Sequence, residues 1–475
     1  MPHSHLVPKV TSAQAVEDLK KLVGSSNVLT GVEDLLVWGS DWTKVFKPKP
    51  MCIVLPAETK EVSQILAYCH KNELAVTPSG GRTGLCAGAV ATDGEVVLSL
   101  ARMRKILEVD PVGLTITAEA GVTTEALQIA ARENGLFFPL DLASKGSCQI
   151  GGNIATNAGG VKLIRYGGMR EQVLGLEVVL ASGEILDMNV ALRKNNSGYD
   201  LKQLFIGSEG TLGVVTKAIL RLTSKPRQLH LTVMAVSKFE SILQILHQCT
   251  LASLSITAFE FFTDVAHKIV LQRAHGAKSP FQNISPFYVL LEIEQTGEEG
   301  ELERLLESLF EKGLITDAAI AANSTQFKEL WGLRENITES LAAHGQVRKN
   351  DISLAIDKLG AFISALQSLL STKACEDMDL VLFGHIGDGN LHINYVSPKS
   401  RDSAEFHAAA RAIEEDVFKL LADFDGSISA EHGIGLTKKK DLHFTRSQSE
   451  VAWMRVMKKS WDPKGILNPG KIFDL

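Results

Sequence analysis

Glycine-rich loops are the feature that most constrains what this chain can fold into. Four glycine clusters lie between residues 78 and 213: PSGGRTG (78–84), KGSCQIGGNIATNAGG (145–160), RYGG (165–168) and IGSEGTLG (206–213). Because glycine has no Cβ, backbone amides in such loops can converge on phosphate oxygens. One such loop alone is more often an ordinary turn, but four in one region predict an extended ligand with a pyrophosphate. None has the spacing of a Rossmann fingerprint or a P-loop, so both are disfavoured.

The residues around these loops alternate short apolar runs with helical patterns. MCIVL and LAVTP predict strands, and TKEVSQILAYCHKNEL predicts a helix with Thr59 as its N-cap. GLEVVLASGEILDM predicts a hairpin that turns at Ser182 and Gly183. We therefore expect a first α+β domain over residues 1–224.

The sequence texture changes at TSKPRQ (223–228), where we predict a domain boundary. Residues 225–425 contain strands such as LHLTVMAV and FYVLLEIE together with long amphipathic helices, which predicts a sheet domain with helices on one face. Residues 426–475 are rich in glycine and turns. They are too few for their own core, so we expect them to pack on the first domain.

Composition places the chain among ordinary globular proteins. At 475 residues it is too long for one core, and a net charge of -6 gives no reason to expect a nucleic-acid partner. Its six cysteines are scattered without a C-x-x-C pair, which favours reduced thiols in an intracellular protein: Cys52, Cys69, Cys86, Cys148, Cys249 and Cys375. No run approaches the ~18 apolar residues of a transmembrane helix, and the N-terminus has no signal or transit pattern. We expect a cytoplasmic or mitochondrial-matrix location and leave peripheral membrane attachment open.

A second motif, FGHIGDGNLHIN (383–394), places His385 and His392 on either side of Gly-Asp-Gly. In one straight strand a separation of seven would put these side chains on opposite faces. If the Gly-Asp-Gly turns the chain, the two rings can face one another, as a metal site requires. The alternative is two sheet histidines hydrogen bonded to backbone.

The order of motifs resembles a known family. PSGGRTGL, PLDLASKGSCQIGGNIATNAGG, RYG, GLEVVLASGEILD and YDLKQLFIGSEGTLGVVT are similar, in this order, to the FAD-binding domain of the vanillyl-alcohol oxidase / p-cresol methylhydroxylase (PCMH) flavoprotein superfamily. Within it the chain resembles D-2-hydroxyacid dehydrogenases from about Pro50 to the C-terminus. The resemblance implies an α+β fold: a PCMH-type two-subdomain FAD-binding domain (1–224), an antiparallel-sheet substrate (cap) domain (225–425) and a C-terminal segment (426–475) returning to the FAD domain.

The resemblance also implies which residues hold FAD. Arg82 stands where relatives with covalent FAD carry a histidine, so we expect a non-covalent cofactor. The implied contacts are Ser79, Gly80, Gly81, Arg82, Thr83, Gly84, Leu85, Pro139, Leu140, Asp141, Gly146, Ser147, Gly151, Gly152, Asn153, Ala155, Thr156, Asn157, Glu209, Gly210, Val214 and Asn468. Glu209, Gly210 and Val214 would lie near the adenine, and Asn468 in the turn NPG would donate to the flavin.

Zinc-dependent members of this group carry G-H-x-G-D-G-N-L-H and A-E-H-G, which stand here at 384–392 and 430–433. The resemblance implies His385, His392 and Glu431 as ligands of Zn²⁺ or a similar divalent metal. Asp388 would either orient a ligand or cap its own turn. His432 would be the catalytic base: it takes the proton of a 2-hydroxyl made more acidic by the metal, while the Cα hydrogen leaves as hydride for the flavin.

The stretch LWGLRENITESLAAHGQVRKNDIS (330–353) resembles the substrate-binding segment of D-2-hydroxyglutarate dehydrogenases. Arg334 and Thr338 lie four apart on one predicted helix, where Arg334 could bind a carboxylate in a bidentate fork. The resemblance adds Lys349 and Asn394 as further substrate contacts. Taken singly, such cations more often decorate a solvated surface. Arg348 departs from the aromatic residue that relatives have before the lysine, which puts the chain-length preference in doubt.

We expect an FAD- and zinc-dependent dehydrogenase that oxidises D-2-hydroxyglutarate to 2-oxoglutarate. The alternatives are an FAD-linked D-lactate dehydrogenase that forms pyruvate, a zinc hydrolase without a redox role, and a binding scaffold that retains only the fold. The expected partners are a 2-hydroxy acid and an external electron acceptor, which could be a flavoprotein, a quinone, a cytochrome or a keto acid. The oligomeric state stays open, with a homodimer among the choices.

Overall fold

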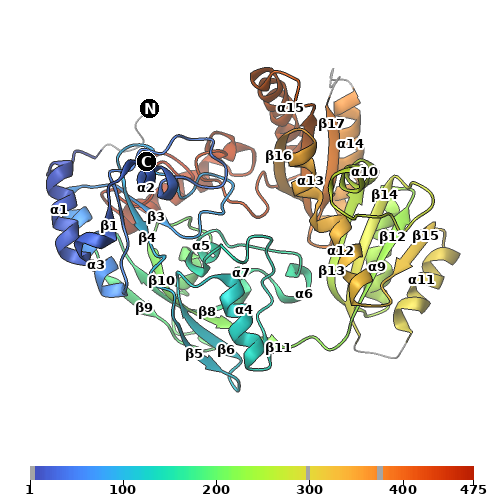
Figure 1. Ribbon diagram of the computed structural model, residues 1–475, viewed down its shortest axis with the longest axis horizontal. Coiled ribbons are helices and arrows are strands. Elements are labelled where there is room, and N and C mark those ends of the chain that lie inside the picture. Colours follow the sequence, from blue (N-terminus) through green and yellow to red (C-terminus); the bar gives the residue numbers. More distant parts are fainter. Residues whose placement is uncertain (1–5, 296–299, 372–377) are drawn as a thin grey trace. The chain divides into compact units, whose positions relative to one another are not determined.

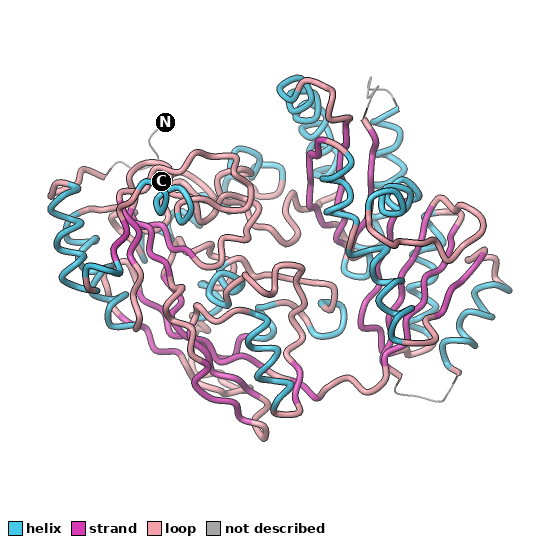
Figure 2. Tube along the Cα trace, viewed as in Figure 1, coloured by secondary structure: helices cyan, strands magenta, loops and turns pink. Residues whose placement is uncertain are grey.

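The computed structural model describes residues 6–295, 300–371 and 378–475, and the chain divides into two units (Figures 1 and 2). The first unit comprises Met1–Gly160, Gly167–Lys225 and Glu431–Leu475, and the second comprises Val161–Tyr166 and Pro226–Ala430. The C-terminal segment from Glu431 is part of the first unit. Val161–Tyr166 belongs to the second unit, which no sequence signal indicated.

Two main sheets form the first unit. One has the order β1-β2-β4-β3, in which the last three strands are parallel: β1 (Val28–Leu29), β2 (Cys52–Val54), β4 (Val96–Ser99) and β3 (Val76–Ser79). The other is antiparallel, in the order β5 (Ile106–Asp110), β6 (Thr115–Glu119), β10 (Val214–Arg221), β8 (Val173–Val179) and β9 (Ile185–Met188). The predicted hairpin is confirmed as β8 and β9. A short pair joins β7 (Leu136–Phe137) to β11 (Thr223–Ser224).

Helices surround these sheets. They are α1 (Ser12–Val23), α2 (Val32–Trp38), α3 (Thr59–Asn72), α4 (Thr124–Glu133), α5 (Ile150–Ala155), α7 (Met169–Gln172), α8 (Lys202–Phe205) and α16 (Gln448–Trp461). Of these, α1, α3 and α4 bury an apolar face. In α3 the buried side chains recur at helical spacing, with Val62, Ile65, Leu66 and Cys69 in the core.

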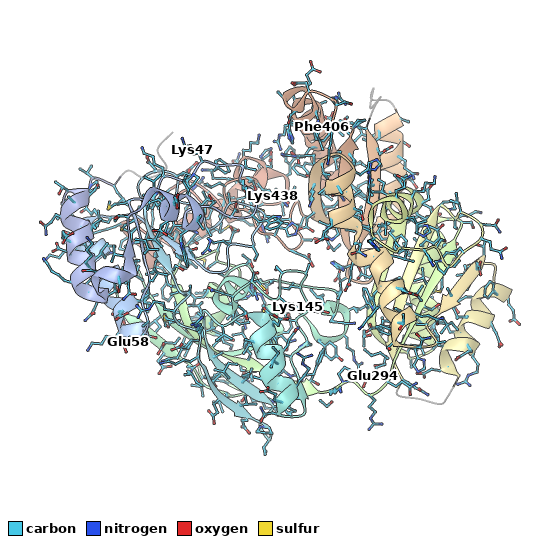
Figure 3. The ribbon with its side chains drawn as sticks, viewed as in Figure 1. Lys47, Glu58, Lys145, Glu294, Phe406 and Lys438 are labelled. Carbon is cyan, nitrogen blue, oxygen red and sulfur yellow. The ribbon has the colours of Figure 1, made fainter. Side chains whose placement is uncertain are left out.

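The predicted N-cap of α3 was wrong. Glu58 occupies the N-cap position (labelled in Figure 3), and it makes no side-chain cap. Thr59 lies inside the first turn, where its hydroxyl donates to the buried carboxylate of Glu177 on β8, 2.5 Å away. The Thr59 hydroxyl therefore bonds Glu177, a residue distant in the chain, instead of capping its own helix.

One seven-stranded antiparallel sheet forms the centre of the second unit. Its order is β15 (Asp317–Ile320), β12 (Leu229–Val236), β14 (Phe287–Glu294), β13 (Ser255–Thr263), β17 (Asp379–Gly384), β18 (Asn390–Ser397) and β16 (Gln346–Ser353).

Helices cover both faces of this sheet, so the prediction of helices on one face was wrong. One face packs against α10 (Asp264–Arg273), α12 (Ser324–Glu335) and α13 (Ile337–His344). The other face carries α9 (Phe239–Leu251), with α11 (Glu301–Glu311) and α14 (Leu359–Ser371) beside it, and α15 (Ser403–Asp423). The short α6 (Leu163–Tyr166) packs on β13. The signal was present in β14, where a nearly continuous apolar run is buried on both sides.

The five cysteines within the described ranges are buried and form no disulfide; Cys375 lies outside these ranges. Among the described residues, no helix combines the length and the apolar character that crossing a membrane needs.

Candidate active site

A pocket opens within the first unit at the glycine loops. It holds about 960 Å³ of empty space, its open mouth included. The loop after β3, the N-terminal turn of α5, the start of β10 and His432 line it. Its walls are therefore mostly backbone and small side chains, as the glycine clusters predicted.

Two features of this lining fit a phosphate-bearing cofactor. Apart from its neighbours in the chain and its own helix, a Cβ added at Gly84 or Gly152 would meet no atom of the described residues within 4 Å, so the backbone there faces open space. At Gly81 a Cβ would lie 2.1 Å from the carbonyl oxygen of Ser147, which shows how closely two of the glycine loops approach. In addition, the buried Ser79 hydroxyl and the Gln149 side-chain oxygen have no hydrogen-bond partner among the described residues. Unpaired polar atoms at the edge of a cavity are the groups that a polar ligand would satisfy.

Most, but not all, of the predicted FAD contacts line this pocket. Those that line it are Ser79, Gly80, Gly81, Arg82, Thr83, Gly84, Gly151, Gly152, Asn153, Ala155, Thr156, Glu209, Gly210 and Val214. The lining does not include Leu85, Pro139, Leu140, Asp141, Gly146, Ser147, Asn157 or Asn468. Sequence reasoning missed Asp41, whose carboxylate accepts from the Ala87 amide and so holds the loop after Gly84.

Glu209 and Asn468 support the pocket wall through protein contacts. The Glu209 carboxylate accepts from the amides of Ile434 (2.7 Å) and Gly435 (2.8 Å), which ties the loop carrying His432 to the loop before β10. Burial raises the pKa of Glu209, against the effect of these two amides. The Asn468 side-chain amide donates to the carbonyls of Gly88 and Glu209, and its contact with the flavin stays a prediction.

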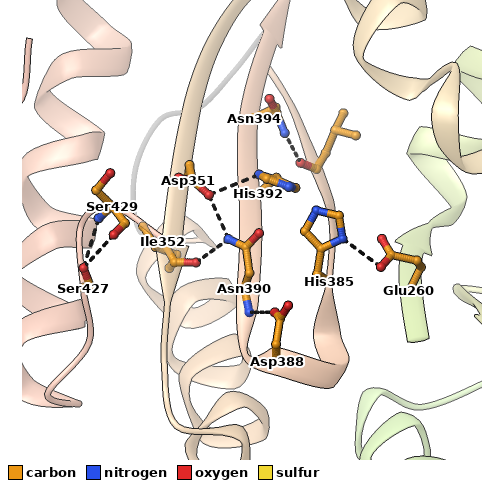
Figure 4. A network of polar contacts seen from close by, with 11 residues as sticks. Glu260, Asp351, Ile352, His385, Asp388, Asn390, His392, Asn394, Ser427 and Ser429 are labelled. Carbon is orange, nitrogen blue, oxygen red and sulfur yellow. Dashed lines mark hydrogen bonds and ion pairs between the residues drawn. The ribbon is translucent and has the colours of Figure 1, made fainter. Parts of the chain in front are cut away.

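In the second unit, Gly-Asp-Gly forms the turn between β17 and β18. A 3-10 turn over Ile386–Asp388 is followed by Gly389 at φ 84°, a conformation that glycine adopts without strain. The turn brings the rings of His385 and His392 to 5.4 Å between centroids, nearly perpendicular to one another (Figure 4). Asp388 accepts from the amide of Asn390 (3.2 Å) and so caps its own turn. Burial raises the pKa of Asp388 to about 6.

Glu431 completes a possible donor set. It follows Ala430, whose amide is held by the carbonyl of Asp351 on β16. One ligand atom each from His385, His392 and Glu431 lies within 4.8 Å of the others. Two imidazole nitrogens and one carboxylate oxygen are a donor set that leaves a position open on zinc. His432, the residue after Glu431 in the chain, lines the pocket.

A buried carboxylate lies next to each of the two histidines, and no sequence motif indicated either carboxylate. Glu260 on β13 lies 2.7 Å from His385 Nδ1, and Asp351, the cross-strand partner of His392, lies 3.5 Å from His392 Nδ1 (Figure 4). The signal for Glu260 was a lone acid inside the apolar strand SITAFEFFT, because a buried charge needs a partner.

Arg334 is buried at the C-terminal end of α12. Its guanidinium lies over the ring of Phe383, 4.7 Å from the centroid, and its Nε is 2.9 Å from Glu260 Oε2. Thr338 is exposed on α13, and Asn336 separates the two helices. The prediction that both residues share one continuous helix was wrong.

Lys349 and Asn394 are cross-strand partners on β16 and β18, on the same sheet face as His392. Lys349 is exposed, and none of the described residues pairs with its ammonium. Desolvation by the surrounding protein atoms lowers the pKa of this ammonium. Arg348 points to the opposite face, where it binds Glu414 of α15 through two contacts of 3.1 and 2.7 Å. The position of Arg348 therefore gives no reason to doubt the chain length expected for the substrate.

Comparison with known proteins defines the class. Residues 225–472 match the family described as FAD linked oxidases, C-terminal domain, and residues 50–189 match the family described as FAD binding domain. The chain belongs to the FAD-linked oxidase family and is an FAD-dependent oxidoreductase of α+β fold. This removes the alternative of a zinc hydrolase without a redox role.

Its relatives cover nearly the whole chain. D-2-hydroxyglutarate dehydrogenase of Xanthomonas citri is 47% identical over 96% of both chains, and the protein of that name from Stutzerimonas stutzeri is 44% identical over 98% of this chain and 100% of its own. The mitochondrial D-2-hydroxyglutarate dehydrogenase of Bos taurus is 40% identical over 99% of this chain and 85% of its own. Among solved structures, p-cresol methylhydroxylase is 17% identical, with a TM-score of 0.78 over 99% of both chains, which shows the shared fold.

Proposed function

We propose that this chain oxidises D-2-hydroxyglutarate to 2-oxoglutarate with non-covalent FAD and a divalent metal. The observation that carries the proposal is the donor set His385, His392 and Glu431. The residue after Glu431 is His432, which lines the glycine-loop pocket. The names of the relatives supply the substrate. Zinc is the metal that best suits two imidazoles and one carboxylate.

The residues divide the work by charge. A dicarboxylate needs two cationic or polar contacts beyond its reacting carbon, and Arg334 and Lys349 supply them, with Asn394 beside Lys349 and Thr338 on α13. Bound zinc would lower the pKa of the 2-hydroxyl, and bound FAD would accept the hydride from Cα. His432 takes the hydroxyl proton as general base. One proton and one hydride therefore leave the substrate, and an external acceptor must reoxidise the flavin.

The experiment is an anaerobic titration of the purified, FAD-loaded protein followed by the visible flavin spectrum. D-2-hydroxyglutarate should bleach the flavin, and the L-enantiomer should not. Treatment with a chelator should stop the bleaching while FAD stays bound, and added zinc should restore it. A flavin that stays oxidised with D-2-hydroxyglutarate, with zinc present, would refute the proposal.

A further inference from the structure

Glu260 is a buried carboxylate that no sequence motif indicated. It lies on β13 with only 1% of its surface exposed, on the sheet face that carries Phe262. Its two oxygens are directed at two different site residues, His385 and Arg334.

The first oxygen determines which nitrogen of His385 is free. Glu260 Oε1 lies 2.7 Å from His385 Nδ1 (Figure 4). A metal-binding imidazole donates the N–H of its other ring nitrogen to a carboxylate placed in this way, which assigns the hydrogen to Nδ1. The lone pair is then on Nε2, which is the form a metal-binding imidazole needs. Glu260 thus sets both the tautomer and the orientation of the ring.

The second carboxylate oxygen of Glu260 contacts the Nε side of the Arg334 guanidinium. Oε2 is 2.9 Å from Nε, a close ion pair in which the N–H is not aligned for a hydrogen bond. The ring of Phe383 covers one face of the guanidinium. Within the described ranges, no protein acceptor pairs with the two terminal amino groups. The fork that could receive a ligand carboxylate is therefore positioned and left open.

We propose that Glu260 is a positioning residue that couples metal affinity to dicarboxylate recognition through its two oxygens. The inference rests on the proposed function, in which His385 binds the metal and Arg334 binds a substrate carboxylate. Removing the charge of Glu260 should loosen both at once, because a neutral amide accepts through one oxygen only and turns an N–H toward Arg334.

The chain offers a matched control in Glu292. This second buried carboxylate lies on the same face of the sheet, on β14, opposite Ala258. It accepts from Trp331 Nε1 at 2.9 Å and bonds Lys162 and Thr257, and it contacts neither His385 nor Arg334. Neutralising it removes a similar buried charge without touching the two site residues.

The experiment compares Glu260→Gln, Glu260→Asp and Glu292→Gln as FAD-loaded proteins. Zinc affinity is measured by competition with a chelator, in the absence of substrate. KM is measured for D-2-hydroxyglutarate and for D-lactate at saturating zinc. We expect Glu260→Gln to weaken zinc binding about 10- to 100-fold, the usual effect of losing the carboxylate behind a metal-binding histidine. Its KM should rise for the dicarboxylate more than for lactate.

Glu260→Asp keeps the charge and should recover part of both losses, and Glu292→Gln should change neither quantity. Zinc affinity within twofold of wild type in a folded Glu260→Gln protein would overturn the proposal. So would weaker zinc binding with an unchanged KM, or equal losses in Glu292→Gln. If Glu260→Gln does not fold, Glu260→Asp against wild type decides on the same two measurements. A wild-type protein that neither binds zinc nor oxidises D-2-hydroxyglutarate would instead refute the proposed function itself.

Discussion

The two units prepare their binding sites in opposite ways. In the first unit the pocket is lined mainly by backbone, and glycines such as Gly84 and Gly152 leave open space where side chains would otherwise stand. In the second unit the side chains around His385 and His392 include buried carboxyl and guanidinium groups, among them those of Glu260, Asp351 and Arg334. A pocket lined mainly by backbone suits a ligand that carries its own charge. A charged side-chain cluster suits a metal ion and a small acid, because its groups must be paired until those ligands arrive.

The largest expected effect tests the residue next to the donor set. His432→Ala should lower kcat about 10²- to 10⁴-fold, the range for a general base, while FAD and zinc content stay at wild-type levels. Steady-state kinetics and cofactor analysis measure this. His443→Ala is the control, since His443 is an exposed histidine of the same C-terminal segment. Near-normal turnover in His432→Ala would remove His432 from the role of base.

A smaller effect tests charge recognition in the second unit. Lys349→Ala should lower kcat/KM for D-2-hydroxyglutarate about 10- to 100-fold, because a charge-assisted contact to the second carboxylate is lost. The value for D-lactate, which has one carboxylate, should change much less. Arg348→Ala is the matched control, because the neighbouring side chain points to the other face and binds Glu414. Equal losses for both acids in Lys349→Ala would favour the D-lactate alternative.

The smallest effect tests the glycine-loop pocket of the first unit. Gly81→Ala should destabilise the protein by about 1–3 kcal/mol, because its Cβ would meet the carbonyl of Ser147 and push two loops apart. Gly84→Ala has room for its Cβ, so it should keep the stability and weaken only FAD binding. Thermal unfolding of the FAD-free proteins and FAD titration separate the two results. Wild-type stability in Gly81→Ala would contradict the close contact between the loops.

The predictable parts of this protein were those that the local sequence encodes. The glycine loops, the β8–β9 hairpin and the turn between the two histidines depend on residues close together in the chain, because glycine and turn residues act on their own backbone. Motif order added the family, and the comparisons confirmed it. The roles of single site residues stay predictions.

What failed in the sequence reasoning depended on distant partners. Thr59 was predicted to cap its own helix, but Glu177 lies within reach of its hydroxyl. Arg334 and Thr338 were placed on one helix that Asn336 divides. Helical periodicity cannot show on which side of a sheet a helix will pack, so the second helical layer was missed.

By itself the sequence determined the class of protein, the glycine cradle and the identities of the possible metal donors, since these follow from residue type and local spacing. Only the tertiary structure decided that Glu260 and Asp351 stand behind the two histidines and that Arg348 turns away from Lys349. The reason is physical: a strand exposes alternate residues to opposite faces, but the neighbour that each side chain meets is set by the pairing of strands far apart in the chain.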